Sequence, residues 1–249
     1  MSKVAIIGNA SGTGVFTVAS PNSNVDRVLT LPDETGTVLT SAKTAPGGLK
    51  SMQVFTSSGT WTKLEGVNLI KVYVTGGGGG GGPCDNDDMA NGGGAGGTAI
   101  KIVDVSGISS VAVTVGAGSA GTANAGGFEG QGATSSFGAY CSATGGRNTG
   151  AATGTTWAIG GAGGIGIGGD INLSGGDGNG GAIDMTNTYL SAGTGGASYW
   201  GGGGAGDNRN NSPAHPRAGQ VYGSGGGGGA ITQTSGNGAG GVVVIEEYA

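Results

Sequence analysis

The clearest candidate for chemistry near the start of the chain is a glycine loop. Val4–Gly14 (VAIIGNASGTG) matches the G-x-x-x-G-x-G pattern of a dinucleotide-binding loop after a short strand. Such a loop binds a pyrophosphate only when a helix follows, because the helix N-terminus faces the phosphates. The next residues, Val15–Pro21, are β-branched and end in proline, and the chain has no Tyr-x-x-x-Lys pair. We therefore predict no nucleotide cofactor, and the lack of a G-x-x-x-x-G-K-[ST] motif excludes a P-loop.

The histidine and cysteine content gives little scope for catalysis or metal binding. His215 lies in Ala214–Pro216, a loop with no nucleophile elbow nearby, so we interpret it as an exposed loop side chain rather than a triad member. One histidine and two cysteines cannot form a multi-histidine zinc site. Cys84 and Cys141 could form one disulfide, but the N-terminus has no secretory signal pattern, which favours two reduced thiols.

Carboxylates gather in one short stretch, DNDD. Asp85, Asp87 and Asp88 could bind Ca²⁺ through carboxylate oxygens, but we favour a solvated acidic turn. Gly175–Ile183 approaches the Ca²⁺-binding nonapeptide repeat, yet Gly180 replaces the aspartate ligand and the unit occurs once. No pair of carboxylates suited to acid–base catalysis can be named. We predict no metal, no cofactor and no enzymatic activity.

The high glycine content limits which secondary-structure elements can position these residues. Glycine makes up 64 of 249 residues, with 8 in residues 1–71 and 56 in residues 72–249. This excludes a helical bundle, because interior glycine costs about 1 kcal/mol per site relative to alanine, and the glycine runs lack the strict period of collagen. The net charge of −5 divides into +2 and −7 over the same two parts. An acidic body with four basic residues excludes strong binding to nucleic acid or an anionic membrane surface, and no apolar run is long enough for membrane insertion.

Strand-like runs frame the glycine tracts. Four of them are β-branched and partly alternating: Asn68–Thr75, Ala99–Val105, Ser110–Val115 and Val242–Tyr248. Ser51–Thr62 indicates two strands around Ser57–Gly59, and residues 1–40 indicate short strands separated by turns. Since the chain also has low charge and three scattered tryptophans, this pattern favours a folded β protein over a disordered one.

The tracts between these strands predict polyglycine II helices. They are Gly76–Gly82, Gly92–Gly97, Gly160–Gly169, Gly201–Gly206 and Gly225–Gly229. Such a helix has three residues per turn, a rise of about 3.1 Å per residue and no internal hydrogen bonds, so each N–H and C=O must pair with a neighbouring chain. Ordering a residue costs roughly 1–2 kcal/mol, whereas a hydrogen bond returns about 0.5–1.5 kcal/mol. A glycine stack therefore needs an apolar base, which the β segments could supply.

We predict a mainly β protein with irregular structure and almost no α-helix, built in two parts. Residues 1–49 form a short β segment for fibre attachment and oligomerisation. Residues 50–249 form a glycine-rich domain with a β base, packed polyglycine tracts and exposed loops. The first part has too few apolar residues for a core of its own, so its strands would bury their apolar faces against symmetry mates.

Polar or aromatic insertions interrupt the glycine tracts at four places. They are Pro83–Asn91, Arg147–Trp157, Ile183–Leu190 and Asp207–Tyr222. Rigid rods joined by such loops would project them from one end or edge, as scaffolds present binding loops, although they could also be mere connectors. The candidate contact residues are Asp85, Asn86, Asp87, Trp157, Tyr189, Leu190, Arg209, Asn211, His215, Arg217 and Tyr222.

Several motifs resemble those of bacteriophage tail-fibre proteins. Gly12–Leu39 resembles a segment seen in many of them, and Leu64 departs from a TWTKP-type motif only at a turn. In architecture, glycine tracts alternating with variable loops are similar to the polyglycine-sandwich adhesins at the tips of T-even-type long tail fibres. Motifs that resemble the glycine-rich domain of phage tail-fibre and receptor-binding proteins are Ser51–Thr62, Gly66–Gly82, Phe137–Gly146, Gly195–Gly204, Tyr222–Gly229 and Gly240–Tyr248.

The resemblance implies a receptor-binding adhesin of the virion, made in the host cytoplasm and joined to other tail-fibre proteins. Its partner would be a bacterial surface receptor, either an outer-membrane protein or a glycan, contacted through the loops between glycine tracts. Tail fibres of this kind are usually homotrimers. The resemblance also implies that Tyr199 and Trp200 are scaffold residues of the glycine layer, as are Phe137, Tyr140 and Cys141.

Two alternatives stay open at the level of sequence. The chain could be a purely structural virion fibre or decoration protein, with recognition performed by another chain. Its glycine content is also similar to that of an ice-binding protein built from polyglycine II helices, although the polar loops argue against flat Gly-X-X faces.

Overall fold

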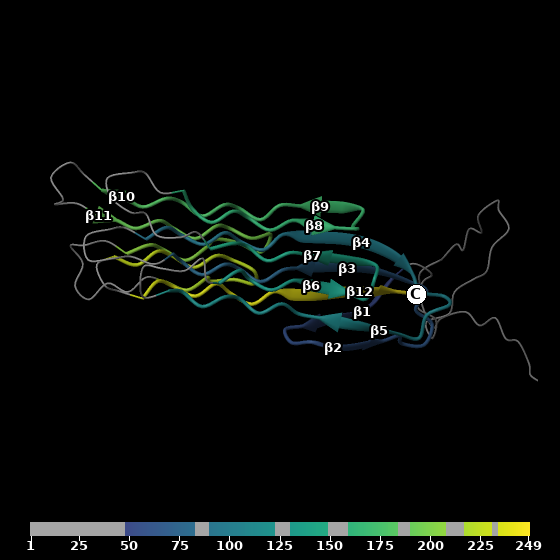
Figure 1. Ribbon diagram of the computed structural model, residues 1–249. Helices are drawn as coiled ribbons and strands as arrows, with labels where there is room; N and C mark the ends of the chain where they lie inside the picture. The colour runs from purple at the N-terminus through teal and green to yellow at the C-terminus, as the bar shows by residue number, and fades with distance from the viewer. Residues whose placement is uncertain are drawn as a thin grey trace, which may run out of the picture. The chain divides into compact units, whose positions relative to one another are not determined.

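The computed structural model describes residues 48–82, 90–122, 130–148, 159–183, 190–207, 217–230 and 234–249. These residues belong to one compact unit, Leu39–Ala249, and they form strands and extended tracts with no helix (Figure 1). The predicted mainly β fold is confirmed. The short strands expected in residues 1–40 lie outside the described residues.

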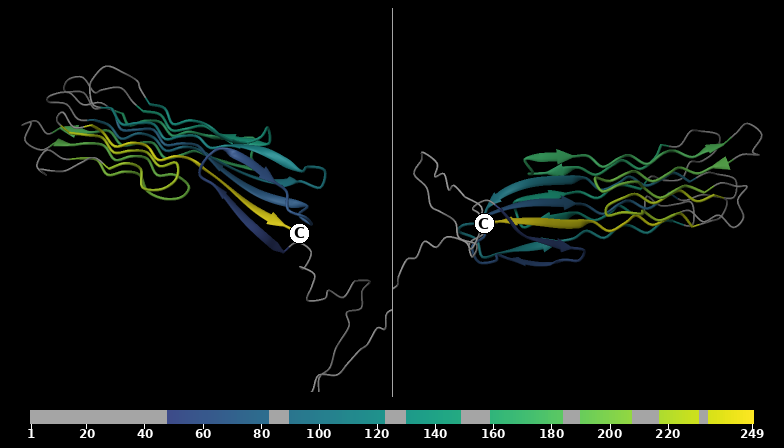
Figure 2. Two further views of the ribbon diagram at one scale, coloured as in Figure 1. Left: turned by 90° about the horizontal axis from the view of Figure 1, so that it is seen from below. Right: turned by 180° about the vertical axis from the view of Figure 1, so that it is seen from behind.

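Two antiparallel five-stranded sheets form a sandwich (Figures 1 and 2). Sheet A has the strand order β1-β12-β3-β4-β9, and sheet B has the order β2-β5-β6-β7-β8; a third sheet pairs β10 with β11. The strands of sheet A are β1 (Leu49–Phe55), β12 (Val242–Tyr248), β3 (Leu69–Thr75), β4 (Thr98–Asp104) and β9 (Ile171–Leu173). Those of sheet B are β2 (Gly59–Thr62), β5 (Ser110–Thr114), β6 (Ser135–Phe137), β7 (Cys141–Ala143) and β8 (Gly166–Ile167). The small sheet pairs β10 (Ala182–Ile183) with β11 (Leu190–Ser191).

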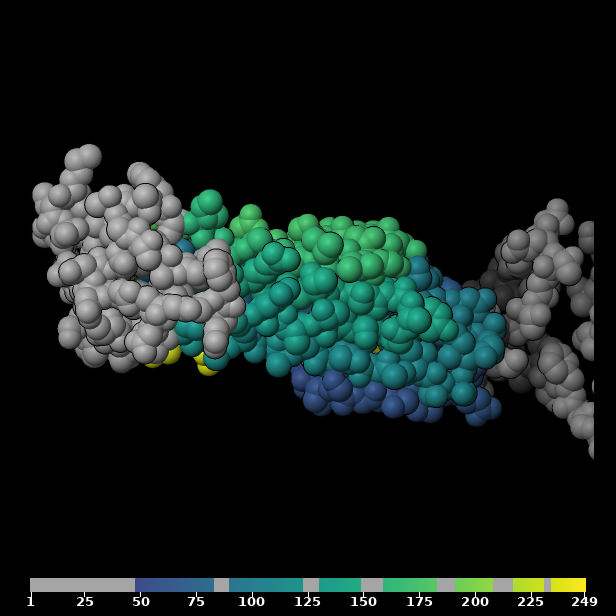
Figure 3. Space-filling view, in the orientation of Figure 1, coloured from purple at the N-terminus to yellow at the C-terminus, as the bar shows by residue number. Residues whose placement is uncertain are grey.

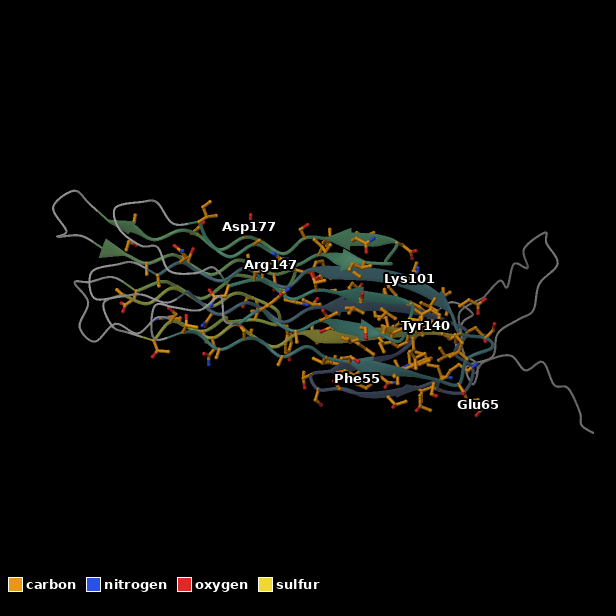
Figure 4. The ribbon with its side chains drawn as sticks, viewed as in Figure 1. Phe55, Glu65, Lys101, Tyr140, Arg147 and Asp177 are labelled. Atoms are coloured by element: carbon orange, nitrogen blue, oxygen red, sulfur yellow. The ribbon has the colours of Figure 1, made fainter. Side chains whose placement is uncertain are left out.

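The apolar core lies between sheets A and B. Alternate residues of β3 and β12 point into it, where Trp61 and Phe137 are fully buried and pack edge to face with ring centroids 5.9 Å apart. The Trp61 indole N–H donates to the buried carboxylate of Glu247 at 2.9 Å. This sandwich is the apolar base that the glycine tracts require. Side chains are dense over the strands and sparse over the tracts (Figure 4).

Extended tracts continue from the strands and run back to them. The tract 76–82 follows β3, for example, and 90–97 leads into β4 (Figure 1). In the described residues the tracts are 76–82, 90–97, 115–122, 130–134, 144–148, 159–165, 174–181, 192–198, 202–207, 217–220, 224–230 and 234–241.

Three of these tracts form the centre of the bundle: 76–82, 90–97 and 224–230. Each bonds to the other two through single amides, with Gly79 N–H donating to Gly94 O at 2.8 Å, Gly93 N–H to Gly226 O at 2.9 Å, and Gly226 N–H back to Gly79 O at 2.9 Å. Their glycines are buried throughout. We refer to these three as the inner tracts.

The remaining described tracts close a ring around the inner ones. Each is hydrogen-bonded to the next, and the last to the first, in the order 144–148, 159–165, 174–181, 192–198, 202–207, 217–220, 234–241, 115–122 and 130–134. An inner tract therefore has two inner and four ring neighbours, six in all. This is hexagonal packing of threefold helices, and the space-filling view shows it as a continuous body with the strands (Figure 3).

A three-residue period runs through the tracts, as a polyglycine II helix requires. Gly76, Gly79 and Gly82 all donate to the neighbouring tract 90–97, whereas Gly78 and Gly81 donate to 234–241. On the ring, exposure repeats with the same period: Ile159, Ala162 and Ile165 on one tract, and Ser191, Thr194 and Ala197 near another. The polyglycine prediction therefore holds.

One predicted tract ends earlier than expected. Gly160–Gly169 was expected to be extended throughout, but the tract stops at Ile165 and the chain enters strand β8. Gly168 then takes a positive φ of 73°, a conformation that favours glycine, in the turn toward β9. That glycine serves a turn, and composition alone could not distinguish this use from a tract.

The close spacing of the inner tracts predicts a large penalty for a single methyl group. A Cβ on Gly93 would lie within 3.0 Å of the carbonyl oxygens of Gly79 and Gly80, whereas one on Gly202 would meet nothing within 4 Å. We expect Gly93→Ala to lower the free energy of unfolding by about 1–3 kcal/mol or more, because the backbone must move apart. Gly202→Ala should change it by less than about 0.5 kcal/mol. Chemical denaturation of both variants measures this, and equal effects would contradict the packing.

Candidate functional site

The ends of the glycine tracts that point away from the sandwich meet at one place, which we call the distal end (Figures 1 and 2). Hydrogen bonds tie these ends together: Gly82 N–H donates to Asn91 O at 2.8 Å, Ala90 N–H to Gly229 O at 3.2 Å, and Ala192 N–H to Asp207 O at 2.8 Å. Six connections start and finish there, namely residues 83–89, 123–129, 149–158, 184–189, 208–216 and 231–233. These connections lie outside the described residues.

Polar side chains bond to backbone groups of the bundle that have no neighbouring tract to pair with. Ser235 is buried at the distal end, where its hydroxyl donates to Gly82 O and accepts from Gly229 N–H at 2.8 Å. The Asn91 side-chain oxygen accepts from Gly181 N–H at 3.0 Å, and that of Asn237 accepts from Gly121 N–H at 2.8 Å. These side chains replace the lateral carbonyl that a further tract would provide, so they stabilise the bundle.

Most of the predicted contact residues fall in the connections, outside the described residues. This applies to Asp85, Asn86, Asp87, Trp157, Tyr189, Arg209, Asn211 and His215. Leu190 is placed only by its backbone, in strand β11. Arg217 is described and exposed, and its backbone is fixed in the lattice by bonds to Ala205 O at 3.0 Å and from Gly227 N–H at 2.9 Å.

Tyr222 does not share the position of Arg217. The expected insertion Asp207–Tyr222 is divided: Asp207 is buried, 217–220 is a tract of the ring, and Tyr222 lies in the turn before the next inner tract. The Tyr222 carbonyl accepts from the Ser198 hydroxyl at 2.7 Å, beside the sandwich rather than at the distal end. The expectation of one continuous loop is corrected, because residues 217–220 continue the hydrogen-bonded packing.

Two connections were missed by the sequence analysis. Residues 123–129 and 231–233 also join tract ends at the distal end, but they are short and close to glycine- and alanine-rich sequence, so they do not read as polar insertions. Counting tract ends would have found them, because each tract that runs away from the sandwich must be connected to one that runs back to it.

The aromatic motif near residue 200 packs on the sandwich. Trp200 lies 6.2 Å from Tyr73 between ring centroids, and its indole N–H donates to Thr75 Oγ1 at 3.0 Å. Tyr199 packs edge to face on Trp200 at 5.1 Å. Both residues therefore act as scaffold, as the motif implied, but their partner is the outer side of sheet A rather than a glycine tract.

Cys141 is a free thiol buried in the core. Burial raises the pKa of this thiol to about 11, which keeps it neutral and unreactive at physiological pH. Cys84 lies outside the described residues, and Cys141 is in strand β7 of the sandwich. The prediction of a reduced thiol is confirmed for Cys141.

No group of three or more His, Cys, Asp or Glu side chains that could hold a metal ion occurs among the described residues. Within the same residues, no helix is long and apolar enough to cross a membrane.

The comparison with protein families places most of the chain in one of them. A model of a glycine-rich domain matches residues 54–248, and the chain therefore belongs to this glycine-rich domain family. The match starts close to the domain boundary expected at residue 50. The description names a composition and no activity. No curated protein sequence matches the chain.

The polar side chains that bond to the backbone at the distal end give a direct test of the hydrogen bonding in the bundle. Ser235→Ala removes a donor and an acceptor, leaving Gly82 O and Gly229 N–H buried without this partner. We expect the free energy of unfolding to fall by about 1–3 kcal/mol. Thr234→Ala, at the neighbouring exposed position, is the matched control and should change it by less than about 0.5 kcal/mol. Thermal and chemical unfolding measure both, and a neutral Ser235→Ala would contradict the role assigned to this hydroxyl.

Proposed function

We propose that this chain is a bacteriophage tail-fibre adhesin that contacts a bacterial surface receptor through its distal end. The observation that carries the proposal is that the described tract ends flanking these six connections meet at one end of a hydrogen-bonded bundle. Binding residues are commonly placed on loops that a rigid scaffold positions. The phage assignment itself is supported by the motifs of the sequence, whereas the family match identifies a glycine-rich domain and does not link it to phages.

The composition of the bundle suits passive presentation. The backbone N–H and C=O groups of its tracts bond to one another. The buried side chains at the distal end, such as Ser235, bond to the backbone of the bundle. Recognition is therefore assigned to the connections and to exposed neighbours such as Arg217. We infer no catalytic role, and the receptor would be either an outer-membrane protein or a glycan.

Adsorption to host cells tests this proposal. The purified full-length chain should bind susceptible cells and block infection by competition. Replacing residues 208–216 by a short Gly-Ser turn, or combining Arg209→Ala with Arg217→Ala, should weaken adsorption roughly tenfold or more, as expected for loss of a binding hot spot. The melting temperature should stay unchanged, because exposed positions contribute little to stability.

A variant at the other end of the bundle provides the control. Tyr222 is exposed but lies beside the sandwich, so Tyr222→Ala should leave adsorption intact. A chain that neither adsorbs nor competes would favour the alternative, a structural virion fibre without direct receptor contact. Adsorption that survives replacement of every distal connection would place the binding surface elsewhere.

A further inference from the structure

One face of the sandwich exposes far more apolar surface than the rest of its exterior. Sheet A turns Val72, Val74 and Ile245 into the core, so their strand neighbours point outward. Those outward residues include Met52 (54% exposed), Val54 (53%), Ile102 (54%), Ile171 (53%) and Leu69 (42%). We call this set, together with Lys71 and Glu246, the outer face.

One row of the outer face is uncovered across four strands of the sheet. Directly opposite residues of antiparallel strands lie on the same face, and the register aligns Met52 with Glu246, Glu246 with Lys71, and Lys71 with Ile102. The next row runs from Val54 on β1 through β12 and β3 to Ile100 and Ile171. The centre of this second row is covered, because Tyr199 and Trp200 pack on Tyr73, and Val244 and Ile100 are buried. The exposed apolar side chains therefore lie in the Met52 row, at Leu69 and at the edge residues Val54 and Ile171. A cluster of exposed apolar side chains marks an interaction site.

The charges on the outer face point to another copy of the chain as the occupant. Glu246 and Lys71 sit side by side at the centre of the face, flanked by apolar residues on both sides. Among the described residues the one salt bridge joins Lys101 and Asp170, so Lys71 and Glu246 form none with each other. Lys71 instead lies over the Tyr73 ring, 4.9 Å from its centroid. A face with one positive and one negative group at its centre is complementary to itself.

The same charges select the direction of the packing. If copies are related by rotation about an axis parallel to the strands, the β1–β12 side of one copy meets the β3–β4 side of the next. Glu246 then faces Lys71, and Met52 faces Ile102. If the strands of the copies run in opposite directions, β12 meets β12 and Glu246 faces Glu246, which like-charge repulsion disfavours.

We propose that the outer face is an interface between copies of this chain, packed with their strands parallel. The glycine tracts of all copies then point the same way, and their distal ends lie at one end of the assembly. The proposed interface does not depend on the proposed adhesin function.

The oligomeric state of the full-length chain tests the interface. Sedimentation or light scattering should give a multiple of the chain mass of 23.3 kDa. Val54→Asp combined with Ile102→Asp should convert the assembly to monomers. Ile159→Asp is the matched control, because Ile159 is 83% exposed on a ring tract away from this face, and it should leave the assembly intact. A monomeric wild-type chain would overturn the proposal, as would an assembly that survives the double variant.

Cross-linking tests the parallel direction. The Cα atoms of Met52 and Ile102 lie three strand spacings apart in one chain, roughly 14 Å, which is too far for an internal disulfide. Met52→Cys combined with Ile102→Cys should give covalent oligomers on oxidation, whereas either single variant should match the wild-type chain. Cross-linking of the Met52→Cys single variant, without extra cross-linking in the double variant, would show opposed strands and overturn the parallel arrangement.

Discussion

The structure depends on one constraint: a polyglycine II helix makes no hydrogen bonds within itself, so its backbone must bond sideways. Gly79 and Gly226 show the solution, since each donates to one inner tract and accepts from the other, while Gly93 donates to Gly226 and accepts from Gly196 of the ring. Ring tracts complete six neighbours around every inner tract. The lateral spacing that these bonds require leaves no room for a Cβ on most inner residues, and this explains why the glycines concentrate in the second part of the chain.

The sandwich and the tracts contribute differently to the stability of the fold. Lateral hydrogen bonds return little more than the cost of ordering the chain, so the apolar core around Trp61 and Phe137 provides the stabilisation that the bundle lacks. Strands β3, β4 and β12 also fix the register of the tracts that continue them. Because the tracts need almost no side chains, variation in the distal connections leaves this framework unchanged. That separation is what makes the bundle suitable for presenting loops.

The sequence was sufficient for the main elements and insufficient for their arrangement. Alternating β-branched residues located β3, β5 and β12 almost to the residue. The glycine runs identified five of the twelve tracts in the described residues. Residues 217–220 were interpreted as loop because they contain a single glycine, although their backbone enters the ring. The sequence analysis therefore placed Tyr222 in one loop with Arg217. In the structure Tyr222 follows the tract 217–220 at its sandwich end, whereas Arg217 begins that tract toward the distal end. Burial and lateral pairing decide these positions, and neither is visible in local composition.

Native-state hydrogen exchange of the backbone amides tests the central claim most directly. If lateral bonds hold the inner tracts, the amides of Gly79, Gly93 and Gly226 should exchange as slowly as those of Val72 and Ile245 in the sandwich, and only through global unfolding. Fast exchange of these glycine amides alongside protected sandwich strands would contradict the account, because it would mean that the tracts open independently of the β core.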